Sequence, residues 1–123
     1  MEQTEITFTM NERSVRALHS AVVFTLDNRG SDARGKKFCE VTHRQLGVNE
    51  MADQMKGVEF LLSKSFVDAN RIGVFGWSFG GYLSSLCLAK GADVFKMAIA
   101  VAPVINWKWY DTIYTERYMR TLA

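Results

Sequence analysis

The stretch GVFGWSFGGYLSS (residues 73–85) places Ser78 between an apolar run and a helical pattern. The run before the serine, residues 72–75, is typical of a buried strand. The residues after it predict a helix from about Gly80 to Lys90, followed by Gly91, a residue that helix C-termini favour. The stretch therefore predicts a sharp strand-to-helix turn with Ser78 at its tip.

The glycines around Ser78 form the pattern Gly-x-Ser-x-Gly, which is typical of a serine nucleophile on a strained turn. The strand and the helix approach each other closely at such a turn, so small residues are needed there. The backbone N–H of Phe79, at the start of the helix, would point toward the oxyanion of a tetrahedral intermediate. We therefore expect Ser78 as nucleophile and Phe79 as oxyanion donor. The structural residues of the turn would be Gly76, Gly80 and Gly81.

Further elements predict an α/β fold around this turn. The apolar run SAVVFTL (residues 20–26) reads as a strand and residues 30–48 as a long loop with room for a helical turn. A helix is expected from Asn49, as its cap, to about Ser65, and a third strand over residues 96–102, before Pro103. Near-continuous apolar strands that alternate with helices favour a parallel sheet with helices on both faces. Residues 27–29, Ser78 and Pro103 would meet at the carboxyl edge of this sheet, where α/β folds bind ligands.

Composition excludes several classes of function. The chain has 123 residues, the size of one domain, and a net charge of only +2 with dispersed basic residues, so we expect no nucleic-acid partner. It contains no apolar run long enough for a membrane span and no export signal at its N-terminus. Cys39 and Cys87 are expected to be free thiols. Cys39 and His43 are too few ligands for a metal site, and no cofactor is expected.

Other expectations concern charged and glycine-rich segments. Arg29, beside Asp27, is expected to tie the loop at the strand end together, and Asp53 and Glu59 are expected to be solvated helix positions. A nucleotide-binding alternative for the turn would need Gly-x-Gly-x-x-Gly or Gly-Lys-Ser/Thr, and neither is present.

The partners of a catalytic serine are missing from the expected part of the sequence. In this arrangement the acid and the histidine follow the serine, but His19 and His43 both precede Ser78. Asp93 and Asp111 follow it, with no histidine after them. Either the catalytic domain is incomplete or the serine is unassisted. We expect the simpler case, an incomplete catalytic domain that is inactive alone.

Longer stretches carry a family resemblance. VDANRIGVFGWSFGGYLSS and DVFKMAIAVAPVINWKWYDTIYTERYM (residues 67–85 and 93–119) resemble the catalytic domain of the prolyl oligopeptidase family, dipeptidyl peptidase IV branch. FTLDNRGSDARGKKF and LGVNEMADQ are similar to the same domain, an α/β-hydrolase fold. The resemblance assigns residues 17–123 to a partial peptidase domain and leaves residues 1–16 unassigned.

The resemblance implies a serine peptidase that cuts after proline or alanine through an acyl-enzyme on Ser78. It also implies a small apolar pocket for the proline, and Trp107, Tyr110 and Tyr114 have the spacing to share one face if their segment is helical. The implied partners are a peptide substrate, the rest of the catalytic domain, a propeller domain and, as often in the family, a second copy of the protein. The residues implied to line the pocket are Val101, Val104, Trp107, Tyr110 and Tyr114.

The sequence departs from the family pattern in several places. It has no Tyr-Gly-Gly-Pro stretch, whose tyrosine is the second oxyanion donor of the family, and the acid and histidine of the triad would fall after Ala123. The glutamates that bind a substrate's amino terminus are also absent, which leaves dipeptidyl and endopeptidase action both open. Two alternatives remain: an esterase or acyl-peptide hydrolase of the same fold, and a non-catalytic gene fragment.

Overall fold

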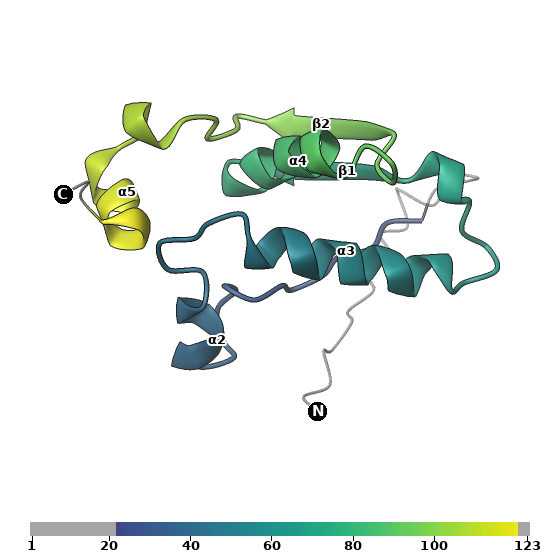
Figure 1. Ribbon diagram of the computed structural model, residues 1–123, viewed down its shortest axis with the longest axis horizontal. Coiled ribbons are helices and arrows are strands. Elements are labelled where there is room, and N and C mark those ends of the chain that lie inside the picture. The colour runs from purple at the N-terminus through teal and green to yellow at the C-terminus, as the bar shows by residue number, and fades with distance from the viewer. Residues whose placement is uncertain (1–21, 121–123) are drawn as a thin grey trace, which may run out of the picture.

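The computed structural model describes residues 22–120. These residues form four α-helices, two strands and two 3₁₀ turns (Figure 1). In chain order they are α2 (Lys36–Glu40), α3 (Asn49–Leu62), η1 (Ala69–Arg71), β1 (Gly73–Trp77), α4 (Phe79–Lys90), β2 (Met97–Val101), η2 (Trp107–Trp109) and α5 (Thr112–Met119).

Strands β1 and β2 form a parallel pair, with α4 as the connection between them. The register runs from Gly73 opposite Met97 to Trp77 opposite Val101. Parallel strands need a crossover of this kind, because a tight turn cannot bring the second strand back in the same direction. The predicted α/β class and parallel sheet are confirmed.

The elements stack as sheet, α4 and α3. Helix α4 packs against both strands on one side and against α3 on the other (Figure 1). The core between them is apolar and centres on Cys87, which is fully buried, with Met51 Sδ 3.4 Å from its Sγ. Both Cys39 and Cys87 are free thiols, as expected, and burial raises the pKa of Cys87 to about 11. The other buried core residues are Val58, Ile72, Leu83 and Phe95.

Within residues 22–120 a helix covers only one face of the sheet. Alternate strand residues point to opposite faces, and those on the face away from α4 are exposed, apart from the half-buried Val101. Phe75 and Trp77 are each 67% exposed, and Met97 and Ile99 are exposed beside them. The expected helices on both faces are therefore not both present among the described residues.

The predicted first strand is wrong where it can be examined. Residues 20 and 21 lie outside the described part of the chain, and residues 22–26 are in no strand. Instead, the ring of Phe24 stacks on Phe60 of α3 with the centroids 5.9 Å apart. A Cβ at Gly57 would lie 3.0 Å from Leu26 Cδ2. The apolar run thus finds its partners on α3, which periodicity alone cannot distinguish from partners in a sheet.

The sequence predicts the position of α3 correctly but not the residue that caps it. Helix α3 begins at Asn49 as expected but ends at Leu62, and its cap is Val48, so the prediction of Asn49 as cap is wrong. The Asn49 side chain donates to the Val41 carbonyl instead, at 3.1 Å. The long loop contains α2, the helical turn for which it had room.

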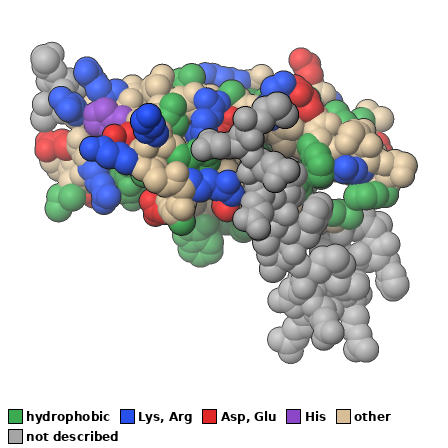
Figure 2. All heavy atoms as spheres, turned by 90° about the horizontal axis from the view of Figure 1, so that it is seen from below, with side chains coloured by type: hydrophobic (Ala, Val, Ile, Leu, Met, Phe, Trp, Pro, Cys, Tyr) green, Lys and Arg blue, Asp and Glu red, His purple; other side chains and the backbone are tan. Residues whose placement is uncertain are grey.

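No helix within residues 22–120 combines the length and the hydropathy that crossing a membrane requires. On the face shown in Figure 2, Lys and Arg side chains stand among Asp and Glu side chains.

Candidate active site

Ser78 occupies the strained turn that the sequence predicts. It follows β1, precedes α4, and has φ 55° and ψ −113°, a conformation that non-glycine residues rarely adopt. Its N–H donates to the Val101 carbonyl at 2.9 Å, which joins the turn to the end of β2. The hydroxyl makes no capping hydrogen bond to α4, although serine is a favourable helix cap. The backbone therefore holds Ser78 in place without engaging its Oγ.

The need for glycine differs among the three turn positions. A Cβ at Gly76 would overlap the Gly80 carbonyl group and lie 2.8 Å from the Gly80 Cα. A Cβ at Gly81 would lie 2.8 Å from the Val101 oxygen and 3.0 Å from the Pro103 Cα. A Cβ at Gly80 would meet nothing within 4 Å. Close approach therefore requires Gly76 and Gly81, whereas Gly80 contributes the backbone against which Gly76 packs.

Phe79 is the first residue of α4, so its N–H has no partner inside the helix. No hydrogen bond joins this N–H to another backbone group of the described residues. The positive end of the α4 dipole lies at the same place. An anion near Ser78 Oγ would therefore find a favourable electrostatic environment.

Aromatic side chains gather beside the turn. The Phe79 and Trp107 ring centroids lie 6.3 Å apart, and Trp107 stacks on Tyr114 at 6.0 Å with nearly parallel planes. Tyr110 meets Trp107 and Tyr114 edge to face, at 6.2 and 5.4 Å. The three aromatic residues predicted to line the pocket thus touch one another, and Trp107 also contacts Phe79, the residue next to Ser78.

The backbone that carries these rings is not one helix, so the condition for a shared helical face is not met. Trp107 belongs to η2, Tyr110 is extended, and α5 begins at Thr112 after an Asp111 cap whose carboxylate accepts the Tyr114 N–H at 2.9 Å. The rings meet because the chain changes direction between η2 and α5, and not because they share one face of a helix. Of the two predicted valines, Val101 is half-buried and Val104 is 5% exposed.

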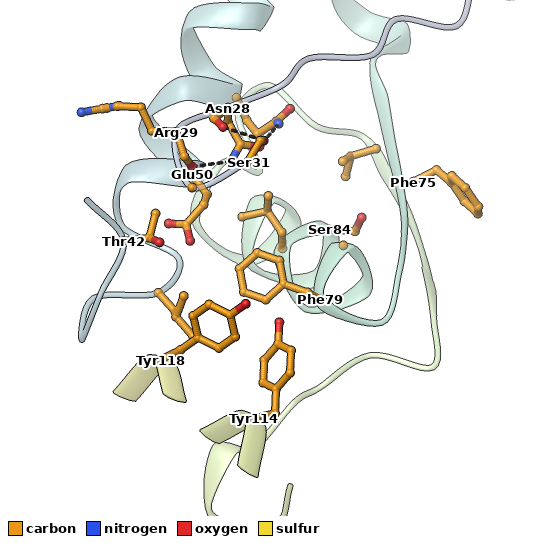
Figure 3. Close-up of a pocket in the computed structure, with 16 residues that line it drawn as sticks. Asn28, Arg29, Ser31, Thr42, Glu50, Phe75, Phe79, Ser84, Tyr114 and Tyr118 are labelled. Carbon is orange, nitrogen blue, oxygen red and sulfur yellow. Dashed lines mark hydrogen bonds between the residues drawn. The ribbon is translucent and has the colours of Figure 1, made fainter. Parts of the chain in front are cut away.

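A cavity of about 360 Å³ adjoins the predicted site on the α3 side. Figure 3 shows Tyr114 and Tyr118 of α5 pointing toward Phe79 of α4, and Glu50 of α3 entering the same space. Phe79, Gly80 and Tyr114 line both the cavity and the predicted site. The cavity lining does not include Ser78, Val101, Val104, Trp107 or Tyr110.

Arg29 and Asp53 form a bidentate ion pair at the rim of this cavity. Arg29 Nη2 lies 2.7 Å from Asp53 Oδ1, its Nε lies 3.0 Å from both carboxylate oxygens, and its backbone N–H donates to Oδ2 at 2.8 Å. Arg29 thus ties its loop to α3, and the expected solvated role of Asp53 is wrong. The reason is that α3 passes beside the loop after Asp27 and presents Asp53 to the whole guanidinium fork. Glu59 is exposed, as expected, and pairs only with Lys56.

The Arg29–Asp53 pair should contribute measurable stability that is lost in acid. Burial alone would raise the pKa of Asp53, but hydrogen bonds and charge from Arg29 outweigh burial and leave this pKa lowered. An acid with a lowered pKa stabilises the fold above its unfolded pKa and loses that contribution as the pH falls through its folded pKa.

We expect a double-mutant cycle of Arg29→Ala and Asp53→Ala, read by urea unfolding, to give a coupling of about 1 kcal/mol at pH 7. This coupling should fall below about pH 4. The exposed Lys56–Glu59 pair is the control, with an expected coupling of about 0.5 kcal/mol or less. Equal couplings for the two pairs would contradict this account.

Within residues 22–120 the one histidine is His43, and its Nε2 makes no hydrogen bond to Ser78 Oγ. His43 lies in the loop after α2, and its Nε2 is buried without a hydrogen-bond partner in the described part of the chain. Cys39 and His43 do not share a helix, because α2 ends at Glu40. Among residues 22–120 no group of three or more His, Cys, Asp or Glu side chains could hold a metal ion.

Sequence reasoning did not identify Tyr82 and Tyr118 as members of the aromatic cluster. The Tyr82 ring lies 5.5 Å from both Phe79 and Trp107, and the Tyr118 ring 4.7 Å from Tyr114. Both follow from helical spacing, since Tyr82 is three residues after Phe79 and Tyr118 four after Tyr114. Helical spacing would therefore have placed both tyrosines beside aromatic residues of the predicted site.

The strained serine turn between a parallel strand and a helix, with the N-terminal end of that helix beside it, defines an α/β-hydrolase fold. The match to the prolyl oligopeptidase family extends over residues 7–123, and the chain belongs to that family.

The chain is similar to proteins named as dipeptidyl peptidases and as prolyl endopeptidases. Human prolyl endopeptidase FAP is 44% identical over 113 residues, which cover 91% of this chain and 15% of that protein. Dipeptidyl peptidase 4 of Felis catus is 46% identical over 98 residues, covering 80% of this chain and 13% of that protein. The crystal structure of Porphyromonas gingivalis dipeptidyl peptidase 4 matches with a TM-score of 0.84 at 43% identity, covering 92% of this chain and 16% of that one. The chain therefore spans only a small part of the length of the relatives it matches.

Proposed function

We propose that this chain carries the nucleophile and the proline pocket of a serine peptidase that cleaves after proline or alanine. The observation that supports the proposal most is the backbone of Ser78, at φ 55°, with its Oγ free of any capping bond. A strained conformation costs about 1–3 kcal/mol and persists where the surrounding structure enforces it. Here Gly76 and Gly81 allow the close approach, and the Val101 carbonyl holds the Ser78 N–H.

In the proposed reaction Ser78 Oγ attacks the carbonyl carbon of the scissile bond. The N–H of Phe79 donates to the oxyanion, and a general base takes the Oγ proton. The protonated base gives its proton to the leaving nitrogen, so that collapse of the intermediate releases the amine and leaves an ester on Ser78. Water then hydrolyses this ester, with its proton passing through the base back to Ser78 Oγ. The base and its acid are proposed to come from residues outside this sequence, as the family resemblance implies.

The aromatic cluster is proposed to supply the specificity. Trp107, Tyr110 and Tyr114 present apolar ring faces next to the turn, and a proline ring is small, rigid and apolar. An apolar pocket of this kind favours proline or alanine and excludes charged side chains, whose desolvation is costly.

A substrate panel tests the proposal. The longest natural polypeptide that contains this sequence would be assayed with prolyl and alanyl amides and with short-chain esters. We expect hydrolysis of the amides, with proline preferred. Hydrolysis of esters alone would instead indicate an esterase of the same fold, and hydrolysis of neither would favour the non-catalytic alternative.

A further inference from the structure

The loop between α2 and α3, residues 41–48, contacts both helices that carry the aromatic cluster. The Arg44 N–H donates to the Tyr118 carbonyl of α5 at 2.8 Å. The Tyr82 hydroxyl of α4 donates to the Leu46 carbonyl at 3.2 Å. One short loop therefore links α4 to α5 independently of the chain that connects them.

The loop is built to receive the Tyr82 hydroxyl. Gly47 has φ 85°, and a Cβ at this position would overlap the Tyr82 oxygen and lie 2.8 Å from Leu86 Cδ2. Only a residue without a side chain leaves room for the hydroxyl there. The Gly47 N–H donates to Glu50 Oε2 at 3.0 Å, and Glu50 is 2% exposed. The buried carboxylate thus fixes the turn that Tyr82 contacts.

Tyr82 reaches the predicted pocket through its ring. It meets Trp107 edge to face at 5.5 Å and Phe79 at 5.5 Å. Trp107 in turn stacks on Tyr114. With its hydroxyl bound to the loop and its ring against Trp107, Tyr82 has little freedom to move, and it limits the freedom of the indole.

We propose that Tyr82 is a positioning residue that fixes Trp107 and thereby sets the preference for proline over alanine. This inference rests on the proposed function. Tyr82 acts through Trp107, so its effect should fall on how well the pocket fits a substrate and not on the chemistry at Ser78. Small displacements of a positioning group are enough to change selectivity.

The Tyr82 hydroxyl stays protonated in the range where peptidases are assayed. Burial raises the pKa of Tyr82, the nearby Glu50 carboxylate adds to the rise, and an interaction with the Trp107 side chain opposes it. The group is therefore a hydrogen-bond donor to Leu46 at neutral pH.

The test is the variant Tyr82→Phe in the longest natural polypeptide that contains this sequence. It removes one hydrogen bond and keeps the ring, so the fold should survive, and a thermal melt checks this. Values of kcat and KM are measured for a prolyl and an alanyl amide that are otherwise identical. The rate at which a fluorophosphonate labels Ser78 is measured in parallel, because this probe contains no proline. Ser85→Ala is the matched control, since it removes a hydroxyl bond to the Gly81 carbonyl, 2.9 Å long, on the same helix.

We expect Tyr82→Phe to lower the proline-to-alanine ratio of kcat/KM by about two- to tenfold, mainly through KM. An effect of this size corresponds to the loss of one neutral hydrogen bond. Labelling of Ser78 should be unchanged, and Ser85→Ala should keep the original ratio. An unchanged ratio in Tyr82→Phe would overturn the inference. So would an equal loss for both amides together with slower labelling, which is what a purely structural role predicts. A parent protein without any proline preference would overturn the proposed function itself.

Discussion

Replacing Ser78 with alanine is expected to lower turnover of a prolyl amide by about 10⁶-fold in the longest natural polypeptide that contains this sequence. The proposed reaction forms a bond to Ser78 Oγ, and no other atom of the turn can replace that oxygen. Losses of this size are typical when a serine nucleophile is removed, and what remains comes from binding and oxyanion stabilisation. The measurement is kcat for the variant and the parent under saturating substrate.

The same experiment needs evidence that the fold is intact. Alanine at φ 55° carries the same backbone strain as serine, and the Ser78 hydroxyl makes no capping bond, so the melting temperature should change little. Ser85→Ala controls for the loss of a hydroxyl on α4 and should keep its activity. Retention of more than a few per cent of turnover by Ser78→Ala would exclude the proposed nucleophile.

Replacing Gly76 with alanine is expected to destabilise the fold by about 3 kcal/mol or more. The new Cβ would overlap the Gly80 carbonyl group, and its obstacle is helix backbone, which cannot move aside like a side chain. Inserting a methyl group into a filled space costs about 1–3 kcal/mol even where side chains can adjust. The measurement is the shift of the unfolding transition in urea.

Gly80→Ala is the matched control for this prediction. Both glycines belong to the Gly-x-Ser-x-Gly pattern, but a Cβ at Gly80 meets nothing within 4 Å. Because Gly80 lies in a helix, alanine there should leave stability unchanged or raise it by up to about 1 kcal/mol. If both variants were equally destabilised, the close approach would not be the reason for glycine at position 76.

Local pattern was sufficient to predict the turn and the elements beside it. The positions of the apolar residues along the sequence predicted the bounds of β1, α4 and β2 to within about two residues. This was possible because each of these elements packs on its neighbours in the chain. Ser78 and its glycines were predictable for the same reason, since their constraint acts between adjacent segments. The family resemblance, and not the periodicity, indicated the pocket residues.

Contacts between distant segments could not be predicted in this way. Residues 22–26 have the pattern of a strand, but Phe24 packs on Phe60 of α3 instead. Arg29 finds Asp53, 24 positions away, and not its neighbour Asp27. Such choices depend on which surfaces the fold brings together, and a single sequence does not encode that in its local spacing.

The most direct test of the central claim is labelling with a fluorophosphonate, read by intact mass and peptide mapping, on the longest natural polypeptide that contains this sequence. The account predicts one added phosphonyl group, located on Ser78 and absent from Ser78→Ala. Folded protein that remains unlabelled, or a label on a different residue, would contradict the assignment of Ser78 as the nucleophile.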